Sequence, residues 1–351
     1  MVLQQPSYSR VRDLSLTKDQ VARILQRVGL PWDGQWKPSK QLLFELHRSF
    51  FYALPFENLS VIERDFVCLD LNSIVDKMCG AEGKSRRGGY CFELNKIFAA
   101  VLLKLGFEVE PRGSRVHNDD GANSQPRRPV SHMILLVKAD EQLYLCDIGF
   151  GKVIAEPLPL ATCIGVPVDG GHCKLKLEQT KSKTTFGMEY DVYSLWYDDT
   201  PAETPKWTRG YSFLPIQEFD FLDSLPCNFL VHGYFESPFT QRVWCERRAP
   251  GEHVRILGRH FRESGPSGST QRDITSAHDL QTLLRQHFGL SVSRDLCHHA
   301  FALGNAEGAE EKWQNLMAAR TGTRRRTRAL LVALCSAAVL GATLRMSFKR
   351  S

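Results

Sequence analysis

The chain is long enough for several domains and has the composition of an ordinary globular protein. Its 351 residues are 42% hydrophobic and 24% charged, which favours two or three domains. The formal net charge of +6 comes from the end of the chain, where residues 320–351 hold eight Lys or Arg and no Asp or Glu. Residues 1–319 therefore carry 37 basic and 39 acidic residues, a net charge of −2. A near-neutral body argues against a nucleic-acid partner.

The ten cysteines predict free thiols rather than a metal site. There is no CxxC pair, and His172-Cys173 and Cys297-His298-His299 stand alone, so no metal is expected. The opening stretch, MVLQQPSYSRVRDLS, is polar and lacks the apolar core of a secretory signal. We therefore expect a catalytic domain in the reducing environment of the cytoplasm.

Residues 1–106 predict a bundle of short helices. Thr17, Ser39 and Asp70 each stand as N-caps ahead of apolar residues at helical spacing. Pro55, within the stretch LPFENL, ends the second of these helices.

The stretch RRGGYCFEL places a cysteine behind two glycines and at the start of a longer apolar helix. From Cys91 onward, apolar residues recur at helical spacing until Gly106. Unpaired N–H groups and the positive end of the helix dipole meet at such a position and favour the reactive thiolate form of a cysteine. The two glycines would let the chain turn sharply and let a substrate come close. Cys91 is thus a candidate nucleophile, and the alternative is a buried structural cysteine.

The pattern then changes to strands, which predicts an antiparallel sheet or barrel over residues 107–200. Strands are expected at SHMILLVK, QLYLCDIGFG, CKLKLEQ and MEYDVYSLWY. Residues 201–290 mix expected strands at NFLVHGYF, RVWCERR and HVRILG with one helix that Ser276 caps. Residues 291–328 are poorly patterned and are expected to be a linker.

Strand register pairs a histidine with an aspartate. A thiolate needs a base to move protons, usually a histidine held by a third group. A hairpin centred between Ala139 and Asp140 places residues whose numbers sum to 279 opposite each other, so that His132 faces Asp147. Directly opposed residues share a face of the sheet, with Cβ atoms roughly 4.5–5.5 Å apart. The spacing therefore predicts a triad of these two residues with Cys91, a set that also suits a cysteine hydrolase or a transglutaminase-like enzyme.

Several segments together resemble the arylamine N-acetyltransferase family. RGGYCFELN, SHMILLV and DIGFG resemble its three catalytic segments in chain order, and LPFENL and SPF resemble further stretches, over residues 16–292 in all. The resemblance implies an α+β fold with a helical bundle, an antiparallel β-barrel and an α/β lid around a cysteine-protease-like Cys-His-Asp core. It also implies transfer of an acetyl or other short acyl group from coenzyme A to an arylamine or hydrazine, through an acyl-cysteine and in ping-pong order. The implied residues are Cys91 as nucleophile, His132 as base and acid, Asp147 as its orienter, and Arg87 as a structural arginine paired with Glu57.

This chemistry requires a coenzyme A thioester as cosubstrate, a small aromatic amine as acceptor and no permanently bound cofactor. Gly149 and Gly151 would let the pantetheine arm pass close to the backbone, and Phe150 could form an aromatic wall for the acceptor. Because no glycine-rich phosphate-binding motif occurs, Arg127 and Arg128 are candidates for contacts with the nucleotide phosphates. The alternative is that this pair only belongs to a solvated loop.

The end of the chain predicts a membrane anchor. Residues 329–344 form an uncharged, mostly apolar run of 16 residues with arginines on both sides. As a helix this run would be about 24 Å long, against a hydrocarbon core of roughly 30 Å, a deficit that flanking arginines can offset by snorkelling. We expect a tail helix that contacts an intracellular membrane and leaves the catalytic domain in the cytoplasm; a helix docked on the enzyme is the alternative.

Overall fold

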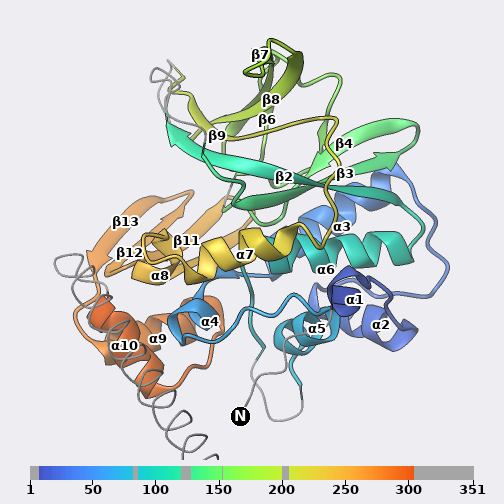
Figure 1. Ribbon diagram of the computed structural model, residues 1–351. Helices are drawn as coiled ribbons and strands as arrows, with labels where there is room; N and C mark the ends of the chain where they lie inside the picture. Colours follow the sequence, from blue (N-terminus) through green and yellow to red (C-terminus); the bar gives the residue numbers. More distant parts are fainter. Residues whose placement is uncertain (1–7, 82–85, 120–127, 152, 200–204, 304–351) are drawn as a thin grey trace, which may run out of the picture. The chain divides into compact units, whose positions relative to one another are not determined.

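The computed structural model describes residues 8–81, 86–119, 128–151, 153–199 and 205–303. The chain divides into two units, Met1–Gly304 and Asn305–Ser351, and all described residues belong to the first. Helices come first in this unit, and two antiparallel sheets follow (Figure 1).

Helices form in the first hundred residues because their apolar residues recur behind side-chain N-caps, as predicted. The Thr17 hydroxyl accepts a hydrogen bond from the N–H of Gln20, whose side chain accepts one from the N–H of Thr17. Ser39 and Asp70 each accept one from an N–H three residues on. The helices are α1 (Tyr8–Arg12), α2 (Lys18–Arg27), α3 (Lys40–Ala53), α4 (Leu59–Ile62), α5 (Leu71–Cys79) and α6 (Cys91–Lys104).

Helix α6 is buried along most of its length and carries Cys91 at its first position. All residues from Cys91 to Leu102 are buried. The helix packs against strands β2 and β3 and against helices α3 and α5. Gly106, with φ of +90°, follows the helix at the predicted place.

An eight-stranded antiparallel sheet covers α6 in the order β5-β4-β3-β2-β9-β8-β7-β6. Its strands are β2 (Glu108–Asp119), β3 (His132–Ala139), β4 (Gln142–Cys146), β5 (Leu158–Pro159), β6 (Val168–Asp169), β7 (Lys174–Lys183), β8 (Glu189–Asp198) and β9 (Thr208–Phe213). The sheet curls (Figure 1), but among the described residues its end strands β5 and β6 do not pair with each other. The expected closed barrel is therefore an open half-barrel, and β9 extends it beyond residue 200.

The hairpin between β3 and β4 turns one residue later than predicted. Asp140 and Glu141 both have positive φ, 46° and 61°, as a two-residue turn of type I′ requires. Leu136 consequently lies opposite Leu145, so opposed numbers sum to 281 and the predicted register is wrong by two residues. Because side chains alternate with a period of two, each side chain still keeps its predicted face.

A five-stranded antiparallel sheet forms the other β-layer and joins distant parts of the chain. It consists of β1 (Phe56–Glu57), β10 (Trp244–Ala249), β11 (Glu252–Leu257), β12 (His260–Gly265) and β13 (Gly268–Asp273), in this order. Helices α9 (Ala277–Phe288) and α10 (Arg294–Leu303) share one hydrophobic core with it. Helices α7 (Ser224–Gly233) and α8 (Pro238–Gln241) contact each other, and α8 also contacts α4.

Two segments differ from the sequence prediction. The stretch NFLVHGYF is not a strand but lies mainly in α7, because a short apolar run does not by itself distinguish a buried strand from a helix. Helix α10 lies within the segment 291–328 that was expected to be a linker. It is held by three buried side chains, Leu296, Cys297 and Ala300.

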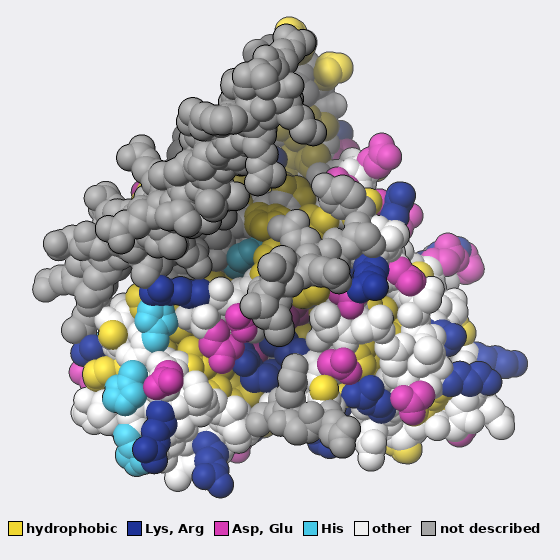
Figure 2. Space-filling model, turned by 60° about the horizontal axis from the view of Figure 1, so that its bottom comes forward, with side chains coloured by type: hydrophobic (Ala, Val, Ile, Leu, Met, Phe, Trp, Pro, Cys, Tyr) yellow, Lys and Arg dark blue, Asp and Glu magenta, His cyan; other side chains and the backbone are white. Residues whose placement is uncertain are grey.

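Lys and Arg side chains are interspersed with Asp and Glu on the described part of the face shown in Figure 2. This mixture agrees with the near-neutral charge of residues 1–319. Within the described ranges, none of the helices is long and apolar enough to cross a membrane. The predicted anchor at 329–344 lies outside those ranges.

Candidate active site

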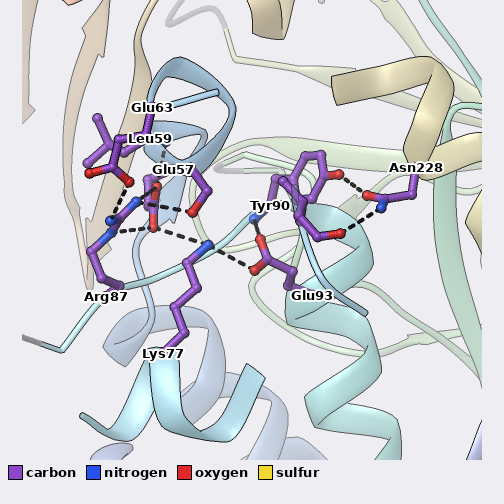
Figure 3. Close-up of polar contacts among 10 residues, drawn as sticks. Glu57, Leu59, Glu63, Lys77, Arg87, Tyr90, Glu93 and Asn228 are labelled. Carbon is purple, nitrogen blue, oxygen red and sulfur yellow. Dashed lines mark hydrogen bonds and ion pairs between the residues drawn. The ribbon is translucent and has the colours of Figure 1, made fainter. Parts of the chain in front are cut away.

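Cys91 is the first residue of helix α6, and hydrogen bonds of Tyr90 and Glu93 fix the start of this helix. The Glu93 carboxylate accepts a hydrogen bond from the N–H of Tyr90 at 3.2 Å, which caps the helix. The Tyr90 hydroxyl donates to the Asn228 side chain of α7, and Asn228 in turn donates to the Val67 carbonyl at 2.9 Å (Figure 3). The Cys91 side chain is 3% exposed and lines a cavity.

The two glycines before Tyr90 are required because other residues of the chain leave no room for a Cβ atom at either position. A Cβ on Gly88 would lie 1.9 Å from the Pro55 carbonyl oxygen, and one on Gly89 would lie 2.8 Å from the Glu93 carboxylate. The crowding that these glycines relieve is therefore with the end of α3 and the start of α6. This differs from the expectation that they let a substrate come close.

A buried network of charges ties strand β1 to the start of α6 (Figure 3). Arg87 donates two parallel hydrogen bonds, of 3.0 and 3.1 Å, to the two oxygens of Glu57. Lys77 lies 2.8 Å from Glu93 and 3.6 Å from Glu57. Burial raises the pKa of Glu57, but Arg87 and Lys77 lower it by more, to about 2. The Arg87–Glu57 pair implied by the family resemblance is thus present.

The three residues predicted as a triad lie together. His132 begins β3, and its Nε2 atom lies 2.7 Å from Oδ2 of Asp147, just past the end of β4. Cys91 and His132 line the same cavity, and Cys91 acts electrostatically on the His132 ring. Burial lowers the pKa of His132, but the adjacent Asp147 and Cys91 raise it by more, to about 10. The imidazole is therefore protonated at neutral pH and can give a proton to a leaving group.

The segment DIGFG carries Asp147 past the helix start. A Cβ on Gly149 would lie only 2.7 Å from the Cys91 Cα, so this position admits no side chain. Gly149, Phe150 and Gly151 all line the same cavity as Cys91 and His132. The missing side chain at Gly149 is thus required by packing on Cys91, and close passage of the pantetheine arm along Gly149 and Gly151 stays a prediction.

The cavity has a volume of about 620 Å³ and an aromatic side. Phe239 stacks on Trp244 with ring centroids 5.5 Å apart, and Phe56 meets both rings at 6.0 Å. Arg128, one of the two arginines predicted to meet phosphates, also lines the cavity. Arg127 lies outside the described residues. The cavity therefore brings a cysteine thiol and the His132 imidazole together with a wall of three aromatic rings.

Comparison with known proteins agrees with this geometry. The model of a family described as N-acetyltransferase matches residues 41–297, most of the chain. The chain belongs to the arylamine N-acetyltransferase family. It is 28% identical to the arylamine N-acetyltransferase / N-hydroxyarylamine O-acetyltransferase of Salmonella typhimurium, over 73% of this chain and 84% of that protein. The Escherichia coli arylamine N-acetyltransferase is also 28% identical, over 78% of this chain and 89% of its own length.

Solved arylamine N-acetyltransferases share the fold. The Nocardia farcinica enzyme superposes with a TM-score of 0.68 at 27% identity, over 83% of this chain and 95% of that one. A Mycobacterium marinum arylamine N-acetyltransferase in complex with CoA superposes with a TM-score of 0.67 at 21% identity, over 80% and 98%. The chain is therefore an enzyme of acetyl transfer, with the α+β architecture of this family.

Sequence reasoning missed a polar residue of this N-acetyltransferase site on α6. Asn95 stands four residues after Cys91 and so on the same helix face. Its amide nitrogen donates to Oδ1 of Asp147 at 2.9 Å and to the Met133 carbonyl at 2.6 Å, while its oxygen accepts from the N–H of Ile148 at 3.0 Å. Asn95 therefore joins Asp147 to the backbone of Met133 and Ile148 on either side of the site. A fully buried Asn in an apolar helix was the available signal.

His47 of α3 holds the same aspartate from behind. Its Nε2 accepts a hydrogen bond from the N–H of Asp147 at 3.2 Å, and its Nδ1 lies 3.2 Å from the Ala155 carbonyl. Burial lowers the pKa of His47 to about 4, so the ring is neutral and donates through Nδ1. The sequence offered no signal, because the contact joins residues 100 positions apart.

Proposed function

We propose that this enzyme moves an acetyl group from acetyl-CoA to an arylamine or hydrazine by way of an acetyl-Cys91 intermediate. The observation that carries the proposal is that Cys91 and His132 line one cavity with an aromatic side, and that His132 is hydrogen-bonded to Asp147 at 2.7 Å. Its members supply a nucleophile, a proton carrier and a group that orients the proton carrier. The relative solved in complex with CoA supports coenzyme A as the acyl carrier.

In the first half-reaction the Cys91 thiolate attacks the thioester carbonyl of acetyl-CoA. The N–H groups of the first turn of α6 have no intrahelical acceptor, and that of Cys91 is the candidate donor to the oxyanion. The tetrahedral adduct then collapses as its bond to the coenzyme A sulfur breaks. His132 gives its proton to that sulfur, which leaves acetyl-Cys91, a neutral imidazole and free coenzyme A.

In the second half-reaction the neutral arylamine attacks the acetyl carbonyl on Cys91. His132 takes the proton that the nitrogen loses, and the bond to the Cys91 sulfur breaks. The products are the N-acetylated amine and the starting thiolate–imidazolium pair. Asp147 stabilises the imidazolium in both halves without itself taking a proton.

The cavity suits these two substrates in turn. The rings of Phe56, Phe239 and Trp244 offer flat apolar surfaces for an aryl group. Phe150 extends the aromatic surface beside His132, with ring centroids 5.3 Å apart. We assign contacts with the coenzyme A phosphates to Arg128, at the cavity rim, and to Arg127.

The test of the intermediate is mass spectrometry of the intact protein after incubation with acetyl-CoA alone. We expect the wild type to gain one acetyl group, located on Cys91 by peptide mapping. Cys91→Ala should gain none and should lose transfer, and Cys91→Ser should be nearly inactive because a serine alkoxide is far harder to form. The matched control is Cys163→Ala, a buried thiol of the half-barrel core. Normal transfer by Cys91→Ala would refute the mechanism.

The order of the two half-reactions has its own test. Because the acetyl group waits on the enzyme, initial rates at several fixed amine concentrations should give parallel double-reciprocal plots against acetyl-CoA. Intersecting plots, with no release of coenzyme A before amine is added, would contradict a ping-pong order. Steady release of acetate without amine would instead identify a cysteine hydrolase.

We further propose that residues 329–344 anchor the cytoplasmic enzyme to an intracellular membrane. The proposal rests on the uncharged run between arginines. It is tested by carbonate extraction of cells that express either the full chain or a version ending at Thr321. The full chain should stay in the membrane pellet and the shorter one in the supernatant. Equal release of both would refute the anchor.

A further inference from the structure

Arg248 of strand β10 is a buried cation without a carboxylate partner. It is 1% exposed and among the largest fully buried side chains. In the part of the chain that the structure describes, it forms no ion pair. Its guanidinium instead donates to three backbone carbonyls, those of Leu54 at 2.9 Å, Ile148 at 3.4 Å and Gly151, and lies 4.1 Å from the centre of the Phe51 ring.

Such an arrangement is unusual for an arginine. Charged side chains are almost never fully buried unless they are paired, because removing a charge from water is costly. Hydrogen bonds to carbonyls and a cation–π contact offset part of that cost. A buried cation that is stabilised only by carbonyls and an aromatic ring, beside an active site, is a candidate for a functional role.

The carbonyls that Arg248 binds belong to two segments that form the site. Leu54 ends α3, immediately before the segment that carries Phe56. Ile148 and Gly151 flank Gly149, whose backbone packs against the Cys91 Cα. The N–H of Ile148 is also bound by Asn95. Arg248 therefore holds from one side the segment that Asn95 holds from the other.

Arg248 also enters the charge balance of the site. Burial lowers the pKa of the Arg248 guanidinium to about 10, although the nearby carboxylates of Glu246 and Asp147 raise it in part. The group is therefore a cation at neutral pH. Arg248 and the protonated His132 thus place two positive charges among the buried carboxylates of Asp147 and Glu246. The other ionisable groups that act on Arg248 and its surroundings are Glu246, which accepts hydrogen bonds from Trp244 and His253, together with Tyr52 and His47.

We propose that Arg248 is a positioning residue for acetyl transfer, which holds segment 148–151 against Cys91 and balances the charge of Asp147. The role in transfer rests on the function proposed above. The role at the thiolate does not, because the reactivity of Cys91 can be measured without any acyl donor.

The test compares two variants of Arg248 with a matched control. Arg248→Met removes the charge and the hydrogen bonds, whereas Arg248→Lys keeps the charge on a single amine that cannot span carbonyls of two segments. The control is Arg259→Met. The Arg259 guanidinium likewise covers an aromatic ring, 3.8 Å from the centre of Phe301, and donates two hydrogen bonds to the Phe301 carbonyl. Phe301 belongs to α10, so this contact does not involve the segments that Arg248 binds.

Two rates are measured for each variant beside its thermal midpoint. One is alkylation of Cys91 by iodoacetamide as a function of pH, and the other is single-turnover release of coenzyme A from acetyl-CoA. Arg248→Met should move the midpoint of the alkylation profile upward by about one pH unit, because the substitution removes a buried positive charge that favours the thiolate. It should also slow acetylation at least tenfold. Arg248→Lys should keep the alkylation midpoint near that of the wild type and still slow acetylation.

Several outcomes decide the proposal. A wild-type alkylation midpoint and a wild-type acetylation rate in Arg248→Met would overturn it. Losses in Arg248→Met and Arg259→Met that follow only their thermal midpoints would also overturn it, because Arg248 would then act on stability alone. If Arg248→Met does not fold, normal acetylation by Arg248→Lys overturns the proposal. A shifted alkylation profile in an enzyme whose wild type never acetylates would refute the proposed function and still support the role at Cys91.

Discussion

Replacing Asp147 by asparagine should disable His132 without removing any packing. Oδ1 of Asp147 accepts hydrogen bonds from Asn95 and from the N–H of Gly149, both at 2.9 Å. These two donors fix the new amide with its oxygen toward them and its NH2 group toward His132. Nε2 of His132, now 2.7 Å from a donor instead of a carboxylate, must accept a hydrogen bond. The ring proton then moves to Nδ1, and the imidazole can no longer take a proton on the side of Cys91.

The size of the effect follows from that change of tautomer. The same substitution in a serine protease lowers the rate about 10⁴-fold, which corresponds to roughly 5 kcal/mol of transition-state stabilisation. Folding should suffer less, by about 1–3 kcal/mol, because the side chain keeps its shape and two of its partners.

The assay is stopped-flow release of coenzyme A from acetyl-CoA without amine, with thermal denaturation in parallel. The matched control is Asp273→Asn, which disrupts an aspartate–histidine pair of 2.8 Å on the surface and should leave the rate unchanged. A loss of less than about tenfold for Asp147→Asn would refute the orienting role.

Further changes test the framework around the nucleophile. Glu57→Gln removes the buried carboxylate that accepts two hydrogen bonds from Arg87 and leaves this arginine, among the described residues, only Glu63 at 3.3 Å as an ionic partner. The substitution should cost about 3 kcal/mol in urea denaturation. Because the folded pKa of Glu57 is about 2 against an ordinary 4.5, its contribution is full above about pH 4.5 and is lost as the pH falls through 2. Acid unfolding of the wild type should therefore steepen in that window, and that of Glu57→Gln should not. Gly88→Ala should destabilise by at least about 2 kcal/mol, since its Cβ would lie 1.9 Å from the Pro55 oxygen. Gly233→Ala, at the end of α7 with no atom within 4 Å of the new Cβ, is its control and should be neutral or slightly stabilising.

Local features of this fold follow from short stretches of sequence. The N-caps Thr17, Ser39 and Asp70 act within one helical turn, and Pro55 ends α3 regardless of its surroundings. The face shared by His132 and Asp147 was also predictable, because alternation along a strand survives an error of two residues in register.

Long-range contacts could not be predicted in the same way. The turn at Asp140-Glu141 requires positive φ at two non-glycine residues, which composition alone does not indicate. His47 and Arg248 reach the site from α3 and β10 only after the chain has folded. The sequence carries no signal of these contacts, because neither His47 nor Arg248 belongs to a motif that would indicate a buried partner.

The pairing of β1 with β10 has a consequence for synthesis of the chain on the ribosome. Phe56 and Glu57 pair with Glu246 and Cys245, so this strand waits for nearly two hundred further residues to be translated. The nascent chain meanwhile holds Cys91, His132 and Asp147 but exposes an unpaired strand edge beside an apolar surface. Such an edge is a site for self-association. A message truncated before codon 244 would therefore encode a complete set of reacting groups in a polypeptide prone to aggregate.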